Sequence, residues 1–293
     1  MKYFLTITLF VFALNGSFSQ ILENPAEVKK DKVNTVVEMW YRYDVDGNMI
    51  PQGSKSIFER YDRNGNRQQL IKYIPGKGID QNFIFKYSKK GDLIGETVTD
   101  GEEKLIDQKK YDYKKGLVSY INGSAPDNIY KIHNLYQDTL LTESVKKKND
   151  KIISSKTFIY NNQNLLEKEI YTSGKVYTTI YEYNDLRQKT SETRFIDTSL
   201  NYTLNYSYDE KGRLKSEEKV DPLKRSLSTL IYNYDQSNRV KTISQHSNYL
   251  ASIHKKWVYQ YDGKGNIEKI TMYDAEESIP VSVTKYIYRY YKE

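Results

Sequence analysis

The chain of 293 residues contains no cysteine, and that absence removes several classes of protein at once. Disulfide bonds, thiol chemistry and zinc sites with cysteine ligands are all excluded. A bacterial lipid anchor, which needs a cysteine at the cleavage point of its signal, is not expected either. The fold must therefore be held together by strand pairing and packing alone.

Apolar residues and helix signals are also scarce. Only 38% of the residues are hydrophobic, 29 residues of the chain are tyrosines, and the mean hydropathy is -0.77. Tyrosine suits half-wet surfaces, so this composition argues against a conventional two-layer core. After the N-terminal segment, no window shows apolar residues at sustained intervals of three and four, and we therefore expect an all-β protein.

The one long apolar stretch lies at the N-terminus, from Tyr3 to Leu14, after Lys2 and before the small-residue triplet Ser17-Phe18-Ser19. This pattern predicts a secretory signal peptide over residues 1–19, cleaved between Ser19 and Gln20. The stretch is shorter than the roughly 20 residues that span a bilayer, so no membrane span is expected after cleavage. The mature protein is then periplasmic or extracellular, with 20–32 as a leader or linker before the repeats of 33–293.

The charge of the chain does not single out a partner. The formal net charge is +7 and is spread evenly, with glutamate interleaved as freely as lysine. We therefore expect no nucleic-acid binding. The one dense basic run, Lys146-Lys147-Lys148, is interpreted as the solvated tip of a hairpin.

Tyrosine-centred copies recur along the whole mature chain. Successive anchor tyrosines are separated by 18 to 29 residues, and all but the first interval fall between 23 and 29. A spacing near 25 residues indicates one supersecondary unit per repeat, in about ten units. The anchors are Tyr43, Tyr61, Tyr87, Tyr113, Tyr136, Tyr160, Tyr183, Tyr208, Tyr234, Tyr261 and an unfinished copy at Tyr288 and Tyr290.

Each unit has the chemistry of a β-hairpin. Aromatic residues occupy every second position before the anchor, as in Tyr202, Tyr206 and Tyr208, which places them on one face of a strand. The anchor is followed by Asp, Asn or Ser and then by polar residues that include Gly or Asn. These residue types are typical of a tight turn between two strands. Segments such as 221–225 are interpreted as irregular loops. We predict that the tandem hairpins form a long, coiled antiparallel meander sheet. This sheet would be an open spiral or solenoid-like, and it would have two edges.

The motif Tyr206-x-Tyr208-Asp209-x-x-Gly212-Arg213-Leu214 resembles the YD-repeat, or Rhs-repeat, family. Similar copies occur at Tyr41 to Met49, Tyr61 to Asn66 and Tyr259 to Ile267. The resemblance covers most of the mature chain and implies hairpin repeats that wind into a spiralling sheet, which large members use as a shell or a cell-surface scaffold. We expect a short form without a toxin or core domain, for which encapsulation is not implied.

The aromatic face is the strongest candidate for a binding site. Its rings either pack on one another as the core of the coil, which we favour, or stack on sugar faces. The densest set comprises Tyr206, Tyr208, Tyr232, Tyr234, Trp257, Tyr259 and Tyr261.

The remaining polar motifs predict no metal, cofactor or catalytic site. The segments beginning at Asp44 and Asp62 resemble the opening of a calcium loop but lack its later ligands, and we predict Asx turns instead. His133, His246 and His254 lie in different repeats without metal-ligand spacing. The paired carboxylates Glu217-Glu218 and Glu276-Glu277 are interpreted as surface charges, because neighbours in a strand point to opposite sides.

Taken together, these features predict a non-enzymatic exported scaffold of the cell envelope or exterior. It would bind an unknown protein partner through a face or edge of the sheet. The alternative is a carbohydrate-binding module that uses the Tyr/Trp face to contact a cell-surface glycan. An enzyme with a fold-built pair of carboxylates would require a concave pocket with two convergent acidic groups about 5 to 9 Å apart.

Overall fold

The computed structural model describes residues 31–126, 128–247, 253–274 and 279–292, and these contain strands and turns but no helix. The predicted signal peptide and most of the leader lie outside the described residues. The strands are β1 (Val33–Arg42), β2 (Ser54–Tyr61), β3 (Arg67–Ile74), β4 (Gly78–Tyr87), β5 (Leu93–Asp100), β6 (Leu105–Lys114), β7 (Leu117–Ala125), β8 (Asn128–Gln137), β9 (Leu140–Lys148), β10 (Lys151–Tyr160), β11 (Leu166–Ser173), β12 (Lys175–Tyr183), β13 (Lys189–Ile196), β14 (Ser199–Tyr208), β15 (Leu214–Val220), β16 (Ser226–Tyr234), β17 (Val240–Ser247), β18 (Ile253–Tyr261), β19 (Ile267–Asp274) and β20 (Pro280–Tyr290).

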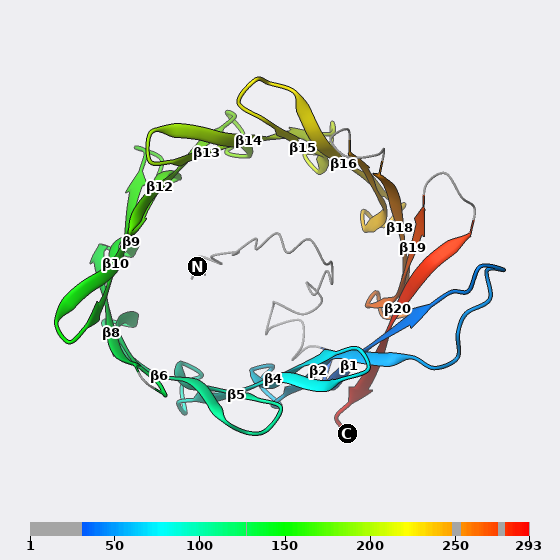
Figure 1. Ribbon diagram of the computed structural model, residues 1–293, viewed down its shortest axis with the longest axis horizontal. Helices are drawn as coiled ribbons and strands as arrows, with labels where there is room; N and C mark the ends of the chain where they lie inside the picture. The colour runs from blue at the N-terminus through cyan, green and yellow to red at the C-terminus, as the bar shows by residue number, and fades with distance from the viewer. Residues whose placement is uncertain (1–30, 127, 248–252, 275–278, 293) are drawn as a thin grey trace.

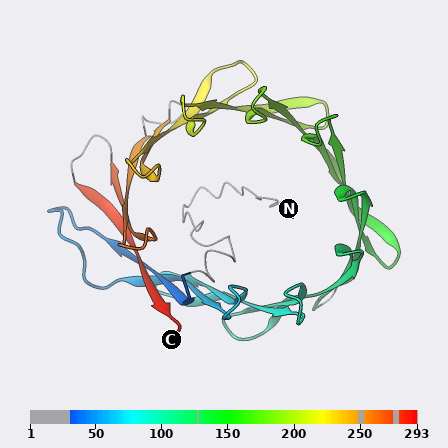
Figure 2. The same ribbon diagram turned by 180° about the vertical axis from the view of Figure 1, so that it is seen from behind.

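The strands form one antiparallel sheet in which each strand pairs with the next along the chain, as the hairpin repeat predicts. The predicted open spiral is wrong, however, because β1 pairs with β20 as well as with β2. The sheet therefore closes into a barrel around a central lumen (Figure 1 and, from behind, Figure 2). Coiling accumulated over 20 strands brings the two expected edges together, and their backbone groups satisfy each other.

The repeat unit has a physical origin at its anchor tyrosine. The strand register shifts at this residue in hairpin after hairpin, for example at Tyr87 and at Tyr208, which marks a β-bulge. A tight turn follows, and its fourth residue has a positive φ, as at Gly212 and Gly265. Glycine recurs there in the sequence because it adopts this conformation without strain.

The meander gives the barrel two rims with different shapes. Connections from an even-numbered to the following odd-numbered strand, such as 209–213, form the turn rim, and the opposite connections, such as 43–53, form the tip rim. The tight turns of the turn rim curl toward the lumen, whereas tips such as those of β9–β10 (green) and β15–β16 (yellow) splay outward (Figures 1 and 2).

This arrangement explains the anomalous first interval of the repeat and corrects the interpretation of one loop. Tyr43 bridges to Met49 on the tip rim, whereas Tyr61 and the later anchors lie on the turn rim, so the interval is only 18 residues. The segment 221–225, interpreted as irregular, is a regular turn in which the N–H of Asp221 donates to the carbonyl of Arg225 at 3.0 Å. The tip rim thus reuses the same turn.

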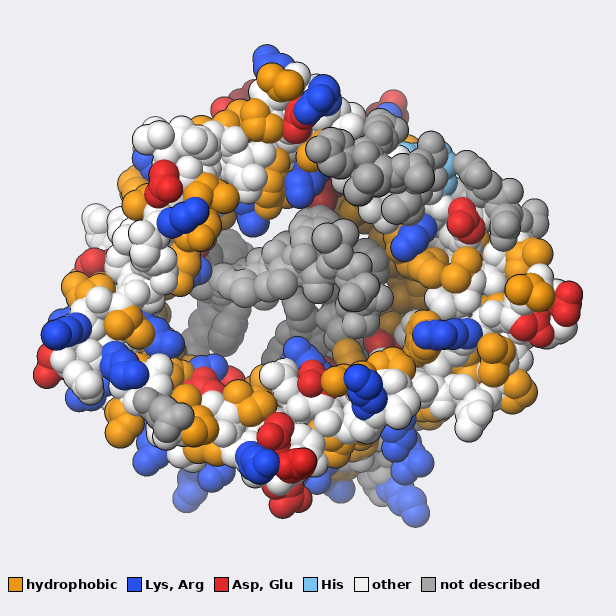
Figure 3. Space-filling view, viewed as in Figure 1, with side chains coloured by type: hydrophobic (Ala, Val, Ile, Leu, Met, Phe, Trp, Pro, Cys, Tyr) orange, Lys and Arg blue, Asp and Glu red, His pale blue; other side chains and the backbone are white. Residues whose placement is uncertain are grey.

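The two faces of the sheet are buried to different extents. The face that carries the tyrosine rows lines the inside of the barrel, where hydrophobic and charged side chains share the visible wall of the lumen (Figure 3). Side chains on the concave face converge, so Leu204, Leu230 and Ile243 are buried beside the tyrosines. On the outer face Asn205 and Ser207 are exposed.

A small core marks the seam where the sheet closes. It contains Val33, Val36, Tyr61, Ile270 and Tyr286, which come from both ends of the chain. Tyr291, the residue directly after β20, reaches across β1. The hydroxyl of Tyr291 donates to the carbonyl of Tyr61 at 2.6 Å, and its N–H donates to the carbonyl of Lys32. The end of the last hairpin is therefore attached directly to the first.

Candidate binding site on the inner face

A ladder of tyrosine hydroxyls connects adjacent hairpins near the turn rim. From Tyr87 onward, each anchor hydroxyl donates to the carbonyl of a residue about 20 positions earlier, at the start of the preceding odd-numbered strand, or one residue into it at β7 and β9. Tyr61 donates to Glu59 instead. The donor and acceptor pairs are Tyr87 to Arg67, Tyr113 to Leu93, Tyr136 to Val118, Tyr160 to Leu141, Tyr183 to Leu166, Tyr208 to Lys189, Tyr234 to Leu214, Tyr261 to Val240 and Tyr288 to Ile267. The unfinished copy at Tyr288 is therefore a complete member of the ladder.

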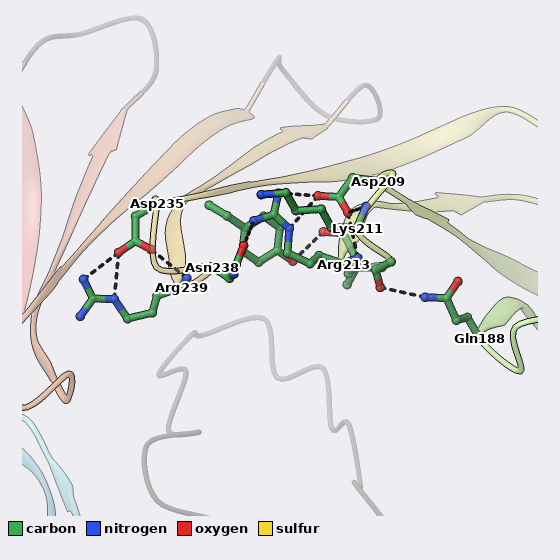
Figure 4. Close-up of polar contacts among 10 residues, drawn as sticks. Gln188, Asp209, Lys211, Arg213, Asp235, Asn238 and Arg239 are labelled. Atoms are coloured by element: carbon green, nitrogen blue, oxygen red, sulfur yellow. Dashed lines mark hydrogen bonds and ion pairs between the residues drawn. The ribbon is translucent and has the colours of Figure 1, made fainter.

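Asp side chains stabilise the turns of the turn rim, next to this ladder, by hydrogen bonds. Asp209 and Asp235 each accept two backbone N–H bonds and also pair with an arginine four residues later, on the inner side of the sheet (Figure 4). Asp44 and Asp62 accept the same backbone bonds, which confirms the predicted Asx turns. These bonds lower the pKa of the Asp44 and Asp209 carboxyls.

Above the turns, a cavity of about 220 Å³ opens on the inner face between β13 and β16. It is lined by side chains of three consecutive hairpins, and several of them are charged. The lining residues are Lys189, Glu192, Arg194, Leu204, Tyr206, Tyr208, Leu214, Glu217 and Tyr232.

Both carboxylate oxygens of Glu192 are occupied. One accepts hydrogen bonds from the Arg194 guanidinium at 2.6 and 2.7 Å, and the other accepts from the Lys189 ammonium at 2.9 Å and from Tyr206 at 3.4 Å. These cations keep the pKa of Glu192 below its ordinary value despite burial. Glu192 is thus a satisfied anion with no oxygen left for a proton transfer.

Glu217 faces the same cavity but, unlike Glu192, has no hydrogen-bond or ion-pair partner among the described residues. Its interpretation as a surface charge is wrong. Only 9% of the residue is exposed, because the pairing of β15 with β14 sets it opposite Tyr206 on the inner face. Burial raises the pKa of Glu217, an effect that the Lys189 charge only partly opposes. Glu218, its neighbour, lies on the outer face, as the strand alternation requires.

The seven predicted aromatic residues do not form one site: three line the cavity, three line a neighbouring depression and one lies at the seam. Tyr206, Tyr208 and Tyr232 line the cavity with Glu217. Tyr234, Tyr259 and Tyr261 line a shallower, more open depression next to it, beside Arg239. Trp257 instead packs against the core of the seam. The hydroxyls of Tyr208, Tyr234 and Tyr261 belong to the structural ladder, so those three side chains have only their rings to offer a ligand.

Sequence analysis missed the polar residues of the cavity and one pair of histidines. Lys189, Arg194 and Glu217 carry no motif, and only the alternation around Leu204 and Tyr206 could have placed them on the same face. His246 and His254 are opposite each other on β17 and β18, with 2.9 Å between their Nδ1 atoms. Within the described ranges, no group of three or more His, Asp or Glu side chains is arranged to hold a metal ion. Glu276 and Glu277 lie outside the described residues.

No protein-family model and no curated protein matches this chain. Among solved structures, it is similar to the TcdB2-TccC3-Cdc42 complex, with 12% identity and a TM-score of 0.36 over 83% of this chain and 18% of that chain. It is also similar to the Tc holotoxin pore of Photorhabdus luminescens carrying a TccC3 mutation, with 11% identity and a TM-score of 0.29 over 85% of this chain. This chain spans 18% of the length of each toxin chain.

A third similar structure is a porin-like protein from Bacteroides uniformis. The identity is 10% and the TM-score 0.39, over 88% of this chain and 98% of that one. In the part of this chain that the structure describes, no helix is long and apolar enough to cross a membrane.

Proposed function

We propose that this protein is a non-enzymatic, exported scaffold that binds a partner protein through the tip rim of its barrel. The observation that carries the proposal is the exposure of aliphatic side chains on the outward-splayed tips. Val45 is 91% exposed, Leu223 73%, Ile129 72% and Ile152 64%. On the turn rim, Leu186 at 75% is the one described large hydrophobic side chain with comparable exposure.

The spacing of these side chains supports a partner that covers much of the rim. Val45 and Leu223 lie in the β1–β2 and β15–β16 connections, and Ile129 and Ile152 are the second residues of β8 and β10, next to the β7–β8 and β9–β10 connections. These four places are distributed around the ring (Figure 1). Single exposed apolar side chains are common on protein surfaces, so the support comes from four of them, each at least 64% exposed, sharing one rim. Tyrosine, by contrast, is concentrated on the inner face, where its ladder is structural.

The charges among the tips favour a protein over an anionic membrane surface. Residues 100–104 contain Asp100, Glu102, Glu103 and Lys104, and 221–225 pair Asp221 with Arg225, whereas the basic run 146–148 is confined to the single tip of β9–β10. A surface that binds anionic lipid needs an excess of basic residues, whereas interleaved charges of both signs suit the polar rim of a protein interface.

Site-specific photocrosslinking in the producing cells tests this proposal. A photoreactive residue at Leu223 or Ile129 should give one discrete adduct, and the same residue at Leu186 on the opposite rim should not. The adduct should disappear when Val45→Asp and Ile152→Asp are added. Equal crosslinking from both rims, or recruitment of the purified protein to anionic vesicles without any protein adduct, would contradict the proposal.

The assignment to the YD-repeat family is part of the same proposal. Its support is the unit of a bulged anchor tyrosine, an Asx-type turn and a positive-φ residue, which most of the turn-rim hairpins share, although β6–β7 and β8–β9 are joined by two-residue turns. Large proteins with such repeats use the sheet as a wall, and this chain would use it as a self-contained ring. The absence of a catalytic role is supported by Glu192, whose oxygens are both engaged in ion pairs and hydrogen bonds.

Carbohydrate binding on the inner face is a second candidate function, and it does not compete with the first for the same surface. A specific observation favours it: the cavity beside Tyr206 and Tyr232 contains a buried carboxylate without a partner. The chemistry of that cavity is developed below.

A further inference from the structure

Glu217 differs from the other buried glutamates of the barrel. Glu38 is hydrogen-bonded by Ser56 and Tyr286, and Glu59 by Tyr61, with Arg67 at 3.2 Å. Glu192 has the three partners described above. Among the described residues, no group lies within hydrogen-bonding or ion-pairing distance of the Glu217 carboxylate.

Although the residue as a whole is buried, the Glu217 oxygens are not among the fully buried, partnerless polar atoms of the described residues, which are Arg67 Nε and Asn128 Oδ1. At the same place in the repeat, nine residues after the anchor, β5, β11 and β13 carry a glutamate with partners, whereas β17 and β19 carry the buried Ile243 and Ile270, so the fold itself does not require an acid at 217. The carboxylate lines the cavity instead of pointing into packed side chains. Its two oxygens are therefore available as acceptors for a ligand that enters from the lumen.

The charge balance of the cavity indicates an uncharged ligand. Lys189, Arg194 and Glu192 form a group with one net positive charge, and the Glu217 carboxylate compensates for it. A charged ligand of either sign would give this set of four charged side chains and the ligand a net charge in a region of low dielectric constant. A ligand whose hydroxyl groups donate hydrogen bonds would satisfy Glu217 without that penalty.

The aromatic rings of the cavity add a flat apolar contact. One cation position over the Tyr206 ring is already taken by Lys189, whose Nζ lies 4.4 Å from the ring centroid. No such cation is seen over Tyr232 among the described side chains, and the Tyr232 hydroxyl has no protein partner there. Hydroxyl donors on an otherwise apolar ring face are the features of a sugar, and the volume suits one residue rather than a chain.

We propose that this cavity binds a single uncharged sugar residue, with Glu217 accepting hydrogen bonds from its hydroxyl groups and Tyr232 contacting its ring face. The proposal rests on the second candidate function and gives it a site and a ligand class. It does not depend on the tip rim, because the cavity lies on the inner face between β13 and β16.

Saturation-transfer NMR on the full chain provides the test, with the methyl glycosides of glucose, galactose, mannose and N-acetylglucosamine as probes at millimolar concentration. We expect saturation transfer to at least one of them. Glu217→Gln should weaken binding about tenfold, since a charge-assisted hydrogen bond becomes a neutral one. Tyr232→Leu should abolish transfer to the protons of the sugar ring face.

Glu218→Gln is the matched control, because it makes the same change on the outer face one residue away, and it should bind like the natural protein. The proposal is overturned if no glycoside shows transfer, if Glu217→Gln binds equally well, or if methylguanidinium or ethylammonium binds in a Glu217-dependent way instead. If no sugar binds but the tip-rim crosslink still forms, the sugar-site proposal is contradicted and the scaffold proposal is not affected.

Discussion

Each anchor tyrosine from Tyr87 to Tyr288 has two structural tasks, since its ring covers the inner face and its hydroxyl joins neighbouring hairpins. In Tyr234, for example, the hydroxyl donates to the Leu214 carbonyl at 2.7 Å, while Arg213 lies over the ring with its Cζ atom 4.3 Å from the centroid. The same bond recurs around the barrel, so phenylalanine could supply the packing but not the connection. This explains why the rows contain tyrosine at the anchor and Phe83 or Phe85 further from it.

Tyr234→Phe should destabilise the protein by about 1 kcal/mol, because a buried carbonyl loses its donor. Tyr177→Phe is the control, since the Tyr177 hydroxyl has no hydrogen-bond partner among the described residues and the residue is 39% exposed. Urea denaturation followed by circular dichroism measures both. An equal effect of the two substitutions would show that the ladder contributes nothing specific.

Glu217 makes a prediction about stability that is separate from binding. Its pKa is higher in the folded state than its ordinary value, so the folded protein binds more protons than the unfolded chain in the window above pH 4.5. Stability from this group therefore falls as the pH rises through that window. Glu217→Gln should raise the melting temperature at pH 7 and leave it nearly unchanged at pH 4, whereas Glu218→Gln should do neither.

At the scale of the element, the turn between β18 and β19 contains two glycines with different structural requirements. Gly265 has a φ of +91°, whereas Gly263 has no positive φ and has open space where a Cβ atom would stand. Only the first position demands the freedom of glycine. Most turns of this type in the chain have glycine or asparagine at this fourth position for the same reason, with exceptions such as Arg187 and Lys224.

Gly265→Ala should therefore cost about 1 kcal/mol of unfolding free energy, because alanine is strained at positive φ. Gly263→Ala should be neutral or stabilise slightly, since it reduces the freedom of the unfolded chain. Thermal unfolding of the two variants compares identical side-chain changes two residues apart. The interpretation of the turn fails if Gly263→Ala is the more damaging of the two.

At the scale of the whole molecule, closure depends on contacts between the two ends of the chain. Tyr291 donates its hydroxyl to Tyr61 and its N–H to Lys32, and Arg63 lies over its ring at 5.1 Å. Pairing of β1 with β20 lets both strands satisfy their backbone groups, so the barrel has no exposed edge among its described strands. Closure thus protects the ring from edge-to-edge aggregation.

Tyr291→Ala should open the seam without unfolding the rest of the ring. We expect faster amide hydrogen exchange in β1 and β20, while β10 and β11 on the far side keep their protection. Tyr291→Phe retains the ring under Arg63 and loses only the hydroxyl, so it should show a smaller increase. An equal increase of the amide exchange rate in all strands would instead mean that the barrel opens as one unit.

The tyrosine face should also set the alkaline limit of the barrel. Burial raises the pKa of Tyr206, Tyr232, Tyr259 and Tyr286 well above the ordinary value of 10.0. Above pH 10 the unfolded chain loses protons that the folded barrel keeps, so stability falls as the pH rises. Tyrosinate absorbance and circular dichroism should therefore change together, in one cooperative step. Titration of the tyrosines near pH 10 with the sheet intact would contradict this.

The local design of the repeat could be predicted from the residues themselves. Alternating aromatics before Tyr208 and the Asp-x-x-Gly turn after it specify a hairpin, because side-chain alternation and turn conformation are short-range properties. The same reasoning grouped Tyr43 with anchors that lie on the other rim and interpreted 221–225 as an irregular loop. Both errors arise because the turn chemistry is identical at the two ends of a strand, and only strand order tells them apart.

The sequence by itself determined the strands, the turns, the tyrosine rows and the number of hairpins, since each is encoded within about 25 residues. The tertiary structure alone decided that the sheet closes, that the tyrosines face the lumen and that Glu217 is buried beside Glu192. Those outcomes depend on the twist summed over 20 strands and on the register between neighbours. A contact such as that of Tyr291 with Tyr61, separated by 230 residues, has no local signal.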